Sequence, residues 1–179
     1  DISPSEIKRA LANFKGVKGR LEEIENTRGI HAYVDFAHTP NALESVLTNL
    51  RSKLKDSENL IVVFGAAGLR DASKRPIMGK VAATLADRII LTSEDPRIES
   101  PLTIAKDIMR GMPAKIRKGV IVEIDRGKAI DIAINQVANR GDWVVACGKG
   151  HEESMNLDGF IETPWSDHEA MRTALEKKI

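Results

Sequence analysis

Short apolar runs rich in β-branched residues alternate along this chain with longer segments whose apolar residues recur every three or four positions. The apolar runs, each expected to form a buried strand, cover residues 32–36, 60–64, 89–92, 120–124 and 143–147. The periodic segments, each expected to form a helix, cover residues 43–54, 78–85, 102–109 and 130–137. Strands that alternate with helices pair in parallel, so the pattern predicts an α/β fold with a Rossmann-like, mostly parallel sheet flanked by helices.

Capping residues mark where several of these helices begin. Thr39 and Ser100 each place a hydroxyl before a proline, which favours the first turn of a helix. Ser166, followed three positions later by Glu169, has the spacing of a capping box, so a final helix is expected after residue 166.

The N-terminal residues form a separate unit in the pattern. Four apolar residues share one face of a short expected helix: Ile7, Ala10, Leu11 and Phe14. A stretch rich in glycine and lysine, residues 15–19, follows it and is expected to be a linker or hinge. Since the chain starts without methionine and this helix offers an apolar face with no neighbour, we expect the chain to be a fragment of a longer protein.

Polar residues gather just after four of the predicted strands. The carboxyl ends of parallel strands meet at one edge of a sheet, where ligands bind, so the four loops are expected to share a rim. The side chains that they bring to it are Asp35, His38, Arg70, Arg75, Arg97, Lys149, His151 and Glu152. Arginine binds carboxylates or phosphates and acidic residues receive ammonium groups, so this rim suits a ligand that carries phosphate and zwitterionic groups. The histidine spacing matches no metal signature, and no metal site is predicted.

Overall charge and composition exclude several classes of partner. The 27 basic and 26 acidic residues give a net charge of +1, which creates no field that attracts nucleic acid. No apolar run approaches the ~20 residues needed to span a membrane, so no membrane association is expected. The single cysteine, Cys147, fits a reducing compartment, and the cytoplasm is the expected location.

A phosphate-binding loop of the type G-x-x-x-x-G-K-[ST] does not occur in the sequence. Gly148, Lys149 and Gly150 lack both the earlier glycine and the following hydroxyl residue that such a loop requires. A nucleotide bound here must therefore rely on a second domain for its phosphates. We expect no catalysis by this chain alone and assign no catalytic residue within it.

At the loops of the rim the sequence resembles the Mur ligase family, and within that family the ligases that extend UDP-N-acetylmuramoyl-dipeptide. The blocks that carry the resemblance are GRLE (19–22), AHTP (37–40), KRPIMG (74–79), TSEDPR (92–97), GKGHE (148–152) and WSDHEA (165–170). Their order and spacing fit the family from about residue 20 to the end of the chain.

The resemblance implies a protein of three domains, of which this chain is the third. Residues 19–179 would be the C-terminal domain, and residues 1–18 the tail of the central ATPase domain together with the hinge. The family's reaction uses ATP and Mg²⁺, bound mainly by the missing central domain, to activate a substrate carboxylate as an acyl phosphate. The amine of an incoming amino acid then attacks. The implied partners are UDP-N-acetylmuramoyl-L-Ala-D-Glu, a diamino acid and the two missing domains.

Carried over position by position, the resemblance also implies site residues. On the nucleotide side these are Arg20, Asp35 and His38. On the amino-acid side they are Arg75, Asp95, Arg97, Gly148 and Glu152.

The identity of the amino acid stays open between two candidates. Arg97 resembles the arginine of the family's Asp-Asn-Pro-Arg loop, which marks enzymes that add meso-diaminopimelate. Asp95 replaces the neutral amide of that loop with a carboxylate, which favours a purely cationic side chain such as that of lysine. Ala67 and Leu69 also depart from the family pattern, which usually has glycine and aspartate there. We expect meso-diaminopimelate and keep lysine as the alternative.

Three other functions remain as alternatives. The chain could belong to another ligase of the superfamily, such as one that adds glutamate to folate, but the GKGHE and DPR blocks speak against it. A stand-alone nucleotide-binding or amino-acid-binding module is disfavoured by the N-terminal helix and hinge. A degenerate ligase kept as a scaffold finds support only in the changes at Ala67 and Leu69.

Overall fold

A six-stranded, mostly parallel sheet forms the centre of the protein, as the sequence pattern predicts. The computed structural model describes residues 2–14 and 16–177. The strands are β1 (Glu22–Ile24), β2 (His31–Asp35), β3 (Leu60–Phe64), β4 (Arg88–Leu91), β5 (Ile121–Val122) and β6 (Trp143–Cys147). Their order in the sheet is β1-β2-β6-β3-β4-β5, and only β1 runs antiparallel to its neighbour.

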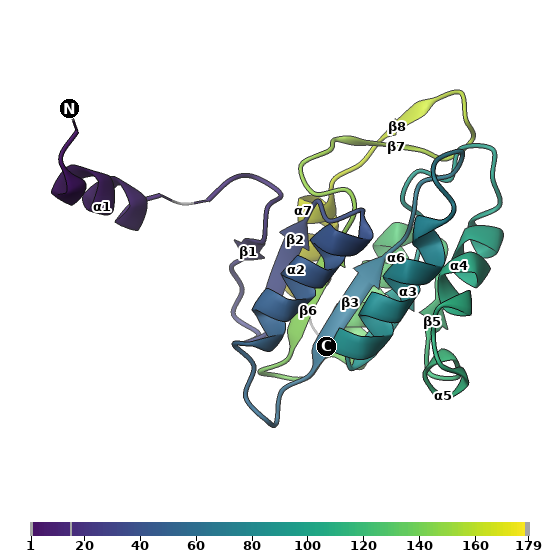
Figure 1. Cartoon of the computed structure of the whole chain (residues 1–179), viewed down its shortest axis with the longest axis horizontal. Coiled ribbons are helices and arrows are strands. Elements are labelled where there is room, and N and C mark those ends of the chain that lie inside the picture. Colours follow the sequence, from purple (N-terminus) through teal and green to yellow (C-terminus); the bar gives the residue numbers. More distant parts are fainter. Residues whose placement is uncertain (1, 15, 178–179) are drawn as a thin grey trace.

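Helices cover both faces of this sheet (Figure 1). One face is covered by α2 (Pro40–Arg51), α3 (Lys74–Leu85) and α4 (Pro101–Arg110), and the short α5 (Ala114–Arg117) follows α4. The other is covered by α6 (Arg126–Ile132), the π-helical turn η1 (Ala133–Val137) and α7 (Asp167–Glu176). No helix in the described part of the chain is long and apolar enough to cross a membrane.

Burial of the central strands on both faces explains why they read as continuous apolar runs. Every residue of β3 and β6 is buried. Successive side chains of a strand point to opposite faces, so Val62 and Phe64 pack with α2, α3 and α4, whereas Ile61 and Val63 pack with α6 and α7. The predicted α/β class and parallel sheet are confirmed.

Three short elements escaped the sequence pattern. These are the edge strand β1, the helix α5 and a hairpin made of β7 (Ser154–Asn156) and β8 (Glu162–Pro164). Each has four residues or fewer and little buried apolar surface, so none produces a periodic signal. The predicted strand at residues 120–124 is also shorter than expected, with ladder pairing confined to two residues.

Two of the three predicted caps form, although at Ser166 only one of the two bonds of a capping box is present among the described residues. Thr39 Oγ1 accepts from the backbone N–H of Ala42, and Ser166 Oγ accepts from that of Glu169. The prediction for Ser100 is wrong, because its side chain makes no capping bond. Its backbone carbonyl alone begins the helix, accepting from Thr103 and Ile104.

The N-terminal helix α1 (Pro4–Ala12) is present, and Ser3 and Glu6 close a complete capping box at its start. It stands apart from the sandwich, and none of its residues is buried (Figure 1). Phe14 lies beyond the end of the helix. Of the expected hinge, Lys15 lies outside the described residues, and so do Asp1, Lys178 and Ile179.

A crevice at the carboxyl edge of the sheet follows from this topology. The loops after β2, β3 and β4 lead to α2, α3 and α4 on one face, whereas the chain after β6 leads through the hairpin to α7 on the other. Strand β6 lies between β2 and β3, so these loops part at its carboxyl end. Ligands of open α/β sheets bind at such a point.

Candidate functional site

The loop after β6 lies at the centre of this edge and packs closely on its neighbours. Gly148 has a φ of +116°, and a Cβ there would lie 3.1 Å from Oε2 of Glu94. Gly150, with a φ of +52°, would place a Cβ 2.7 Å from the side chain of Phe36. Glycine at both positions lets the loop touch the loops after β4 and β2. The predicted site residue Gly148 therefore lies where the loop after β6 touches the loop after β4.

The loops after β3 and β4 interlock next to it. The N–H of Gly68 donates to the carbonyl of Asp95 at 2.8 Å, and Nη1 of Arg97 donates to the carbonyl of Gly68 at 2.8 Å. Leu69 and Arg97 both adopt a left-handed backbone, with φ of 55° and 54°. Non-glycine residues held in this region carry strain, which is concentrated at functional sites in proteins. The strain supports a ligand-binding role for this pair of loops.

A buried lysine joins two of the predicted site residues. Nζ of Lys149 lies 2.9 Å from Oδ1 of Asp95 and 2.9 Å from Oε2 of Glu152. Oδ1 of Asp95 also accepts from the backbone N–H of Asn156, which anchors the β7–β8 hairpin to the same point. The structure thus brings Asp95 and Glu152 together, with an ammonium group of the protein between them.

Arg75 lies in the interior instead of facing the crevice. Its residue is 1% exposed, and its guanidinium binds both carboxylate oxygens of Glu99, one oxygen of Asp107 and the carbonyl of Ala67. Glu99 above all, opposed by burial, holds the pKa of Arg75 above its usual value. This environment fits a residue that holds the loops in place. Direct contact between Arg75 and a ligand stays without support from the geometry.

Arg70, in the same loop, is the arginine that faces solvent. It is exposed and makes no hydrogen bond or ion pair with any described residue. The sequence placed Arg70 on the rim but assigned the ligand contact to Arg75. Burial separates the two arginines, and a sequence pattern does not reveal which of two neighbouring arginines is buried.

Two of the three residues predicted for the nucleotide side, Arg20 and His38, lie around one aromatic ring. The guanidinium of Arg20 lies 4.5 Å from the centre of the Phe36 ring, and the rings of His38 and His151 pack against it at 4.6 Å and 5.0 Å. Asp35 precedes Phe36 directly. The sequence analysis did not single out Phe36, although its place between Asp35 and His38 was a usable signal.

Asp35 holds the hinge against this loop. Its carboxylate accepts from the backbone N–H of Leu21 at 2.6 Å and from that of Ala37 at 2.7 Å. Leu21 has a left-handed backbone, with a φ of 44°. Next to it, a Cβ on Gly19 would lie only 2.2 Å from the backbone nitrogen of His151. The hinge therefore contacts both the nucleotide side and the loop after β6.

The fully buried guanidinium of Arg126 holds the loops after β4 and β6 in place. Arg126, at the start of α6, pairs with both carboxylate oxygens of Asp167 at 2.7 Å. It also donates to the carbonyls of Ser93 and Cys147, the residues just before Glu94 and Gly148. Arg126 thereby fixes the carboxyl ends of β4 and β6. The sequence analysis missed it because its partner Asp167 lies on another helix.

Glu94 is a buried carboxyl group next to Gly148. Its Oε2 has no hydrogen-bond partner among the described residues. Burial, opposed first by the charge of Arg126, raises the pKa of Glu94 above its usual value. Glu94 therefore keeps its proton to a higher pH than an exposed glutamate does.

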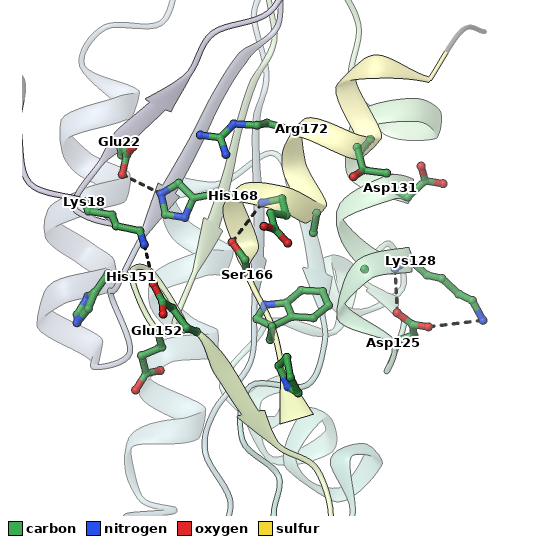
Figure 2. A pocket seen from close by; sticks show the side chains of 18 of the residues that line it. Lys18, Glu22, Asp125, Lys128, Asp131, His151, Glu152, Ser166, His168 and Arg172 are labelled. Carbon is green, nitrogen blue, oxygen red and sulfur yellow. Dashed lines mark hydrogen bonds and ion pairs between the residues drawn. The ribbon is translucent and has the colours of Figure 1, made fainter. Parts of the chain in front are cut away.

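A cleft of about 950 Å³ opens beside the loop after β6, on the face of the sheet covered by α6 and α7 (Figure 2). Its lining includes His151 and Glu152 from the predicted rim, together with Lys18 of the hinge and Glu22 of β1. Figure 2 shows that Glu22 points toward His168 and that Lys18 lies nearer to His151. Glu152 belongs both to this cleft and to the Lys149 cluster. Within the described residues, no three His, Cys, Asp or Glu side chains are arranged to hold a metal ion.

Comparison with known proteins finds relatives that match most of the chain. Residues 19–150 match the family model described as Mur ligase, glutamate ligase domain. A protein of Lawsonia intracellularis named UDP-N-acetylmuramoyl-L-alanyl-D-glutamate--2,6-diaminopimelate ligase is 44% identical over 162 residues, which cover 90% of this chain and 32% of that protein. A protein of Aquifex aeolicus with the same name is 44% identical over 97% of this chain and 34% of its own length.

Solved structures show the same relationship. A structure of UDP-N-acetylmuramoyl-L-alanyl-D-glutamate--2,6-diaminopimelate ligase superposes with a TM-score of 0.80 and 34% identity, over 98% of this chain and 35% of that one. The folylpolyglutamate synthase of Thermotoga maritima superposes less well, with a TM-score of 0.58 and 25% identity over 83% of this chain and 31% of that one. The chain spans about a third of the length of the curated relatives that it matches.

Proposed function

This chain belongs to the Mur ligase family, and we propose that it is the domain that brings the incoming amino acid to the ligase reaction of a longer protein. The whole protein would join 2,6-diaminopimelate, in its meso form, to UDP-N-acetylmuramoyl-L-Ala-D-Glu in an ATP-dependent reaction. Two features support this proposal: the relatives of about 44% identity carry this activity in their names, and the chain covers about a third of them. A protein that handles nucleotide-linked precursors and ATP would work in the cytoplasm.

The observation that carries the proposal is that loops at the carboxyl edge bear two arginines and an acidic group. Arg70 is exposed, and Arg97 uses Nη1 to dock on the carbonyl of Gly68. Guanidinium groups bind carboxylates through two parallel hydrogen bonds. Glu152, whose side chain is 41% exposed, can receive an ammonium group. One end of diaminopimelate carries both groups, so it suits this pair of arginines and this acid.

Gly148 and Arg75 would serve this site without touching the ligand through a side chain. Gly148 has no side chain, so the position next to Glu94 that a Cβ would fill stays open for a ligand. The backbone of Gly148 could also contact that ligand. Arg75 would position the loop that bears Arg70, because it joins that loop to Glu99 and Asp107.

The nucleotide side would use the group around Phe36. Arg20 and His38 lie at the surface of this group and would meet the phosphates or the base of ATP, whereas the carboxylate of Asp35 holds the hinge. Bound ATP supplies the phosphoryl group that activates the carboxylate of the precursor. This chain contributes charge and position, and Mg²⁺ and most phosphate contacts would come from the preceding domain.

Residues 1–18 would belong to that preceding domain and the hinge, and residues 19–179 to the amino-acid domain. Helix α1 supports the division, because its apolar side chains Ile7 and Leu11 are exposed and it stands apart from the sandwich (Figure 1). An apolar helix face of this kind packs against another part of a protein.

Phosphate release tests the proposal. The full-length protein is expected to hydrolyse ATP only when both the UDP-dipeptide and diaminopimelate are present, and the isolated chain is expected to release none. Amino-acid-dependent turnover by the isolated chain would contradict the domain assignment. Release by the full-length protein that ignores the amino acid would contradict the ligase reaction.

A further inference from the structure

The ammonium group of Lys149 lies between two carboxylates, those of Asp95 and Glu152. The residue is 1% exposed, and its Nζ lies 2.9 Å from one oxygen of Asp95 and 2.9 Å from one oxygen of Glu152. A buried ammonium is stable only with opposite charge at hydrogen-bond distance, and here it has two carboxylates.

The two carboxylates differ in what they leave free. Asp95 has a side chain only 17% exposed, and its Oδ1 already accepts from Lys149 and from the backbone N–H of Asn156. Glu152 has a side chain 41% exposed and binds Lys149 through Oε2. Of the two carboxylates, that of Glu152 is therefore the one more accessible to a ligand. The charge of Asp95 is neutralised by the ammonium group of Lys149.

We infer that Lys149 is a specificity-determining residue, whose ammonium keeps a second bare ammonium out of the space between Asp95 and Glu152. The inference rests on the proposed function and names the preferred substrate of that site. A ligand side chain that ends only in ammonium, as in lysine, meets the like charge of Lys149. A side chain that ends in both ammonium and carboxylate places its ammonium on Glu152 and its carboxylate toward Arg97 and Lys149.

The position of Arg97 supports this arrangement. Its Nη1 lies 3.4 Å from the backbone carbonyl of Asp95, so its guanidinium is held beside the cluster. Asp95, which by its charge alone favours lysine, is thus part of a site that selects against lysine. The carboxylate at position 95 and the ammonium at position 149 act together as a neutral pair.

The test uses the full-length protein and compares kcat/KM for meso-diaminopimelate and for lysine, with the UDP-dipeptide and ATP. Lys149→Met is expected to shift the ratio of the two values toward lysine by about tenfold, because two carboxylates then lack their counter-ion. Asp95→Asn is expected to shift the ratio in the opposite direction. The double variant Asp95→Asn/Lys149→Met removes both charges and is expected to return the ratio to within about threefold of the wild-type value.

A matched control is Lys115→Met on α5, which lies at the end of the sheet remote from the β7–β8 hairpin and is expected to leave the ratio unchanged (Figure 1). An unchanged ratio in Lys149→Met, or a shift toward lysine in Asp95→Asn, would overturn the inference and leave the ligase activity standing. A wild-type protein that prefers lysine would also overturn the inference and leave the ligase activity standing. If the wild-type protein joins neither amino acid, the proposed function falls together with the inference. Should Lys149→Met not fold, Lys149→Gln replaces it, and the same shift toward lysine is expected, with an unchanged ratio overturning the inference.

Discussion

Arg75 binds Glu99 through two parallel hydrogen bonds, with its Nη1 and Nη2 at 2.5 Å and 2.7 Å from the two carboxylate oxygens. Arg75 lies at the start of α3, and Glu99 lies near the end of the loop between β4 and α4. The pair thus ties the loop that bears Arg70 to the loop that bears Arg97. Its energetic role is structural, because neither group is left for a ligand.

Loss of Arg75 should therefore reduce stability more than it reduces ligand affinity. Arg75→Met is expected to lower the free energy of unfolding by about 3 kcal/mol, since it removes the buried partner of two partly buried carboxylates, those of Glu99 and Asp107. Arg110 offers a matched control, because it pairs with the same Asp107 but has a side chain that is 74% exposed. Arg110→Met is expected to cost less than about 1 kcal/mol. Urea denaturation measures both, and equal losses would contradict the structural role of Arg75.

Arg70 should show the opposite behaviour. It is exposed and makes no contact that holds the fold, so Arg70→Ala is expected to leave the melting temperature unchanged. In the full-length protein the same change is expected to raise KM for diaminopimelate by ~10- to 100-fold, the effect of losing a charge-assisted contact of ~1.5 to 3 kcal/mol. Arg117→Ala on α5 is the control for removing an exposed arginine elsewhere. A KM that stays at the wild-type value would remove Arg70 from the amino-acid site.

Arg97 combines a proposed ligand contact with a strained backbone, and two substitutions separate these properties. Arg97→Ala and Arg97→Gly both remove the guanidinium, so both are expected to raise KM for diaminopimelate by ~10- to 100-fold. Only glycine relieves the left-handed backbone, whose φ is 54°. The glycine variant is therefore expected to be more stable than the alanine variant by about 1 kcal/mol. Steady-state kinetics and thermal melts check the two effects, and an unchanged KM in both variants would exclude Arg97 from the site.

Glu94 should make stability depend on pH in an unusual direction. Burial raises the pKa of Glu94 in the folded protein, whereas in the unfolded chain the carboxyl ionises near its ordinary value of ~4.3. As pH rises above that value, the unfolded state loses its proton first and is favoured. Wild-type stability is thus reduced by this group at neutral pH, and Glu94→Gln is expected to be more stable than wild type by an amount that grows from pH ~4.5 upward.

Glu99 is a control for that measurement, because its pKa is shifted in the opposite direction to that of Glu94. Its hydrogen bonds with Arg75 hold the pKa of Glu99 below its usual value, so its stabilising effect is present at neutral pH and lost in acid. Glu99→Gln is expected to be less stable than wild type at pH 7, with the difference shrinking as pH falls below ~4.3. Urea denaturation across this pH range follows both variants. Parallel curves for wild type and Glu94→Gln would show that Glu94 is not shifted as described.

The sequence predicts the sheet well and the site only in part, for physical reasons. Strands β3 and β6 are buried on both faces, so their apolar runs are unambiguous. The β7–β8 hairpin is held instead by polar contacts such as the one between Asn156 and Asp95, which leave no periodic pattern. Likewise, only the folded arrangement shows that Lys149 neutralises Asp95 and that Arg126 reaches Asp167 on another helix.

At the loops of the rim, the sequence predicts where the polar residues gather but not which of them remain free. The topology alone brings Asp35, Asp95 and Glu152 to one edge, because each follows a strand of a parallel sheet. Which polar groups remain free depends on burial and on partners distant in sequence. For that reason we propose that Arg75 and Asp35 support the loops and the hinge.

The most direct test of the account is an amino-acid panel with the full-length protein, ATP and UDP-N-acetylmuramoyl-L-Ala-D-Glu, with the tripeptide product identified by mass spectrometry. The account predicts that meso-diaminopimelate yields product with the highest kcat/KM and that lysine is used far less well. Glutamate and alanine should yield none. Product formed only with an amino acid other than diaminopimelate, or with none of those tested, would contradict it.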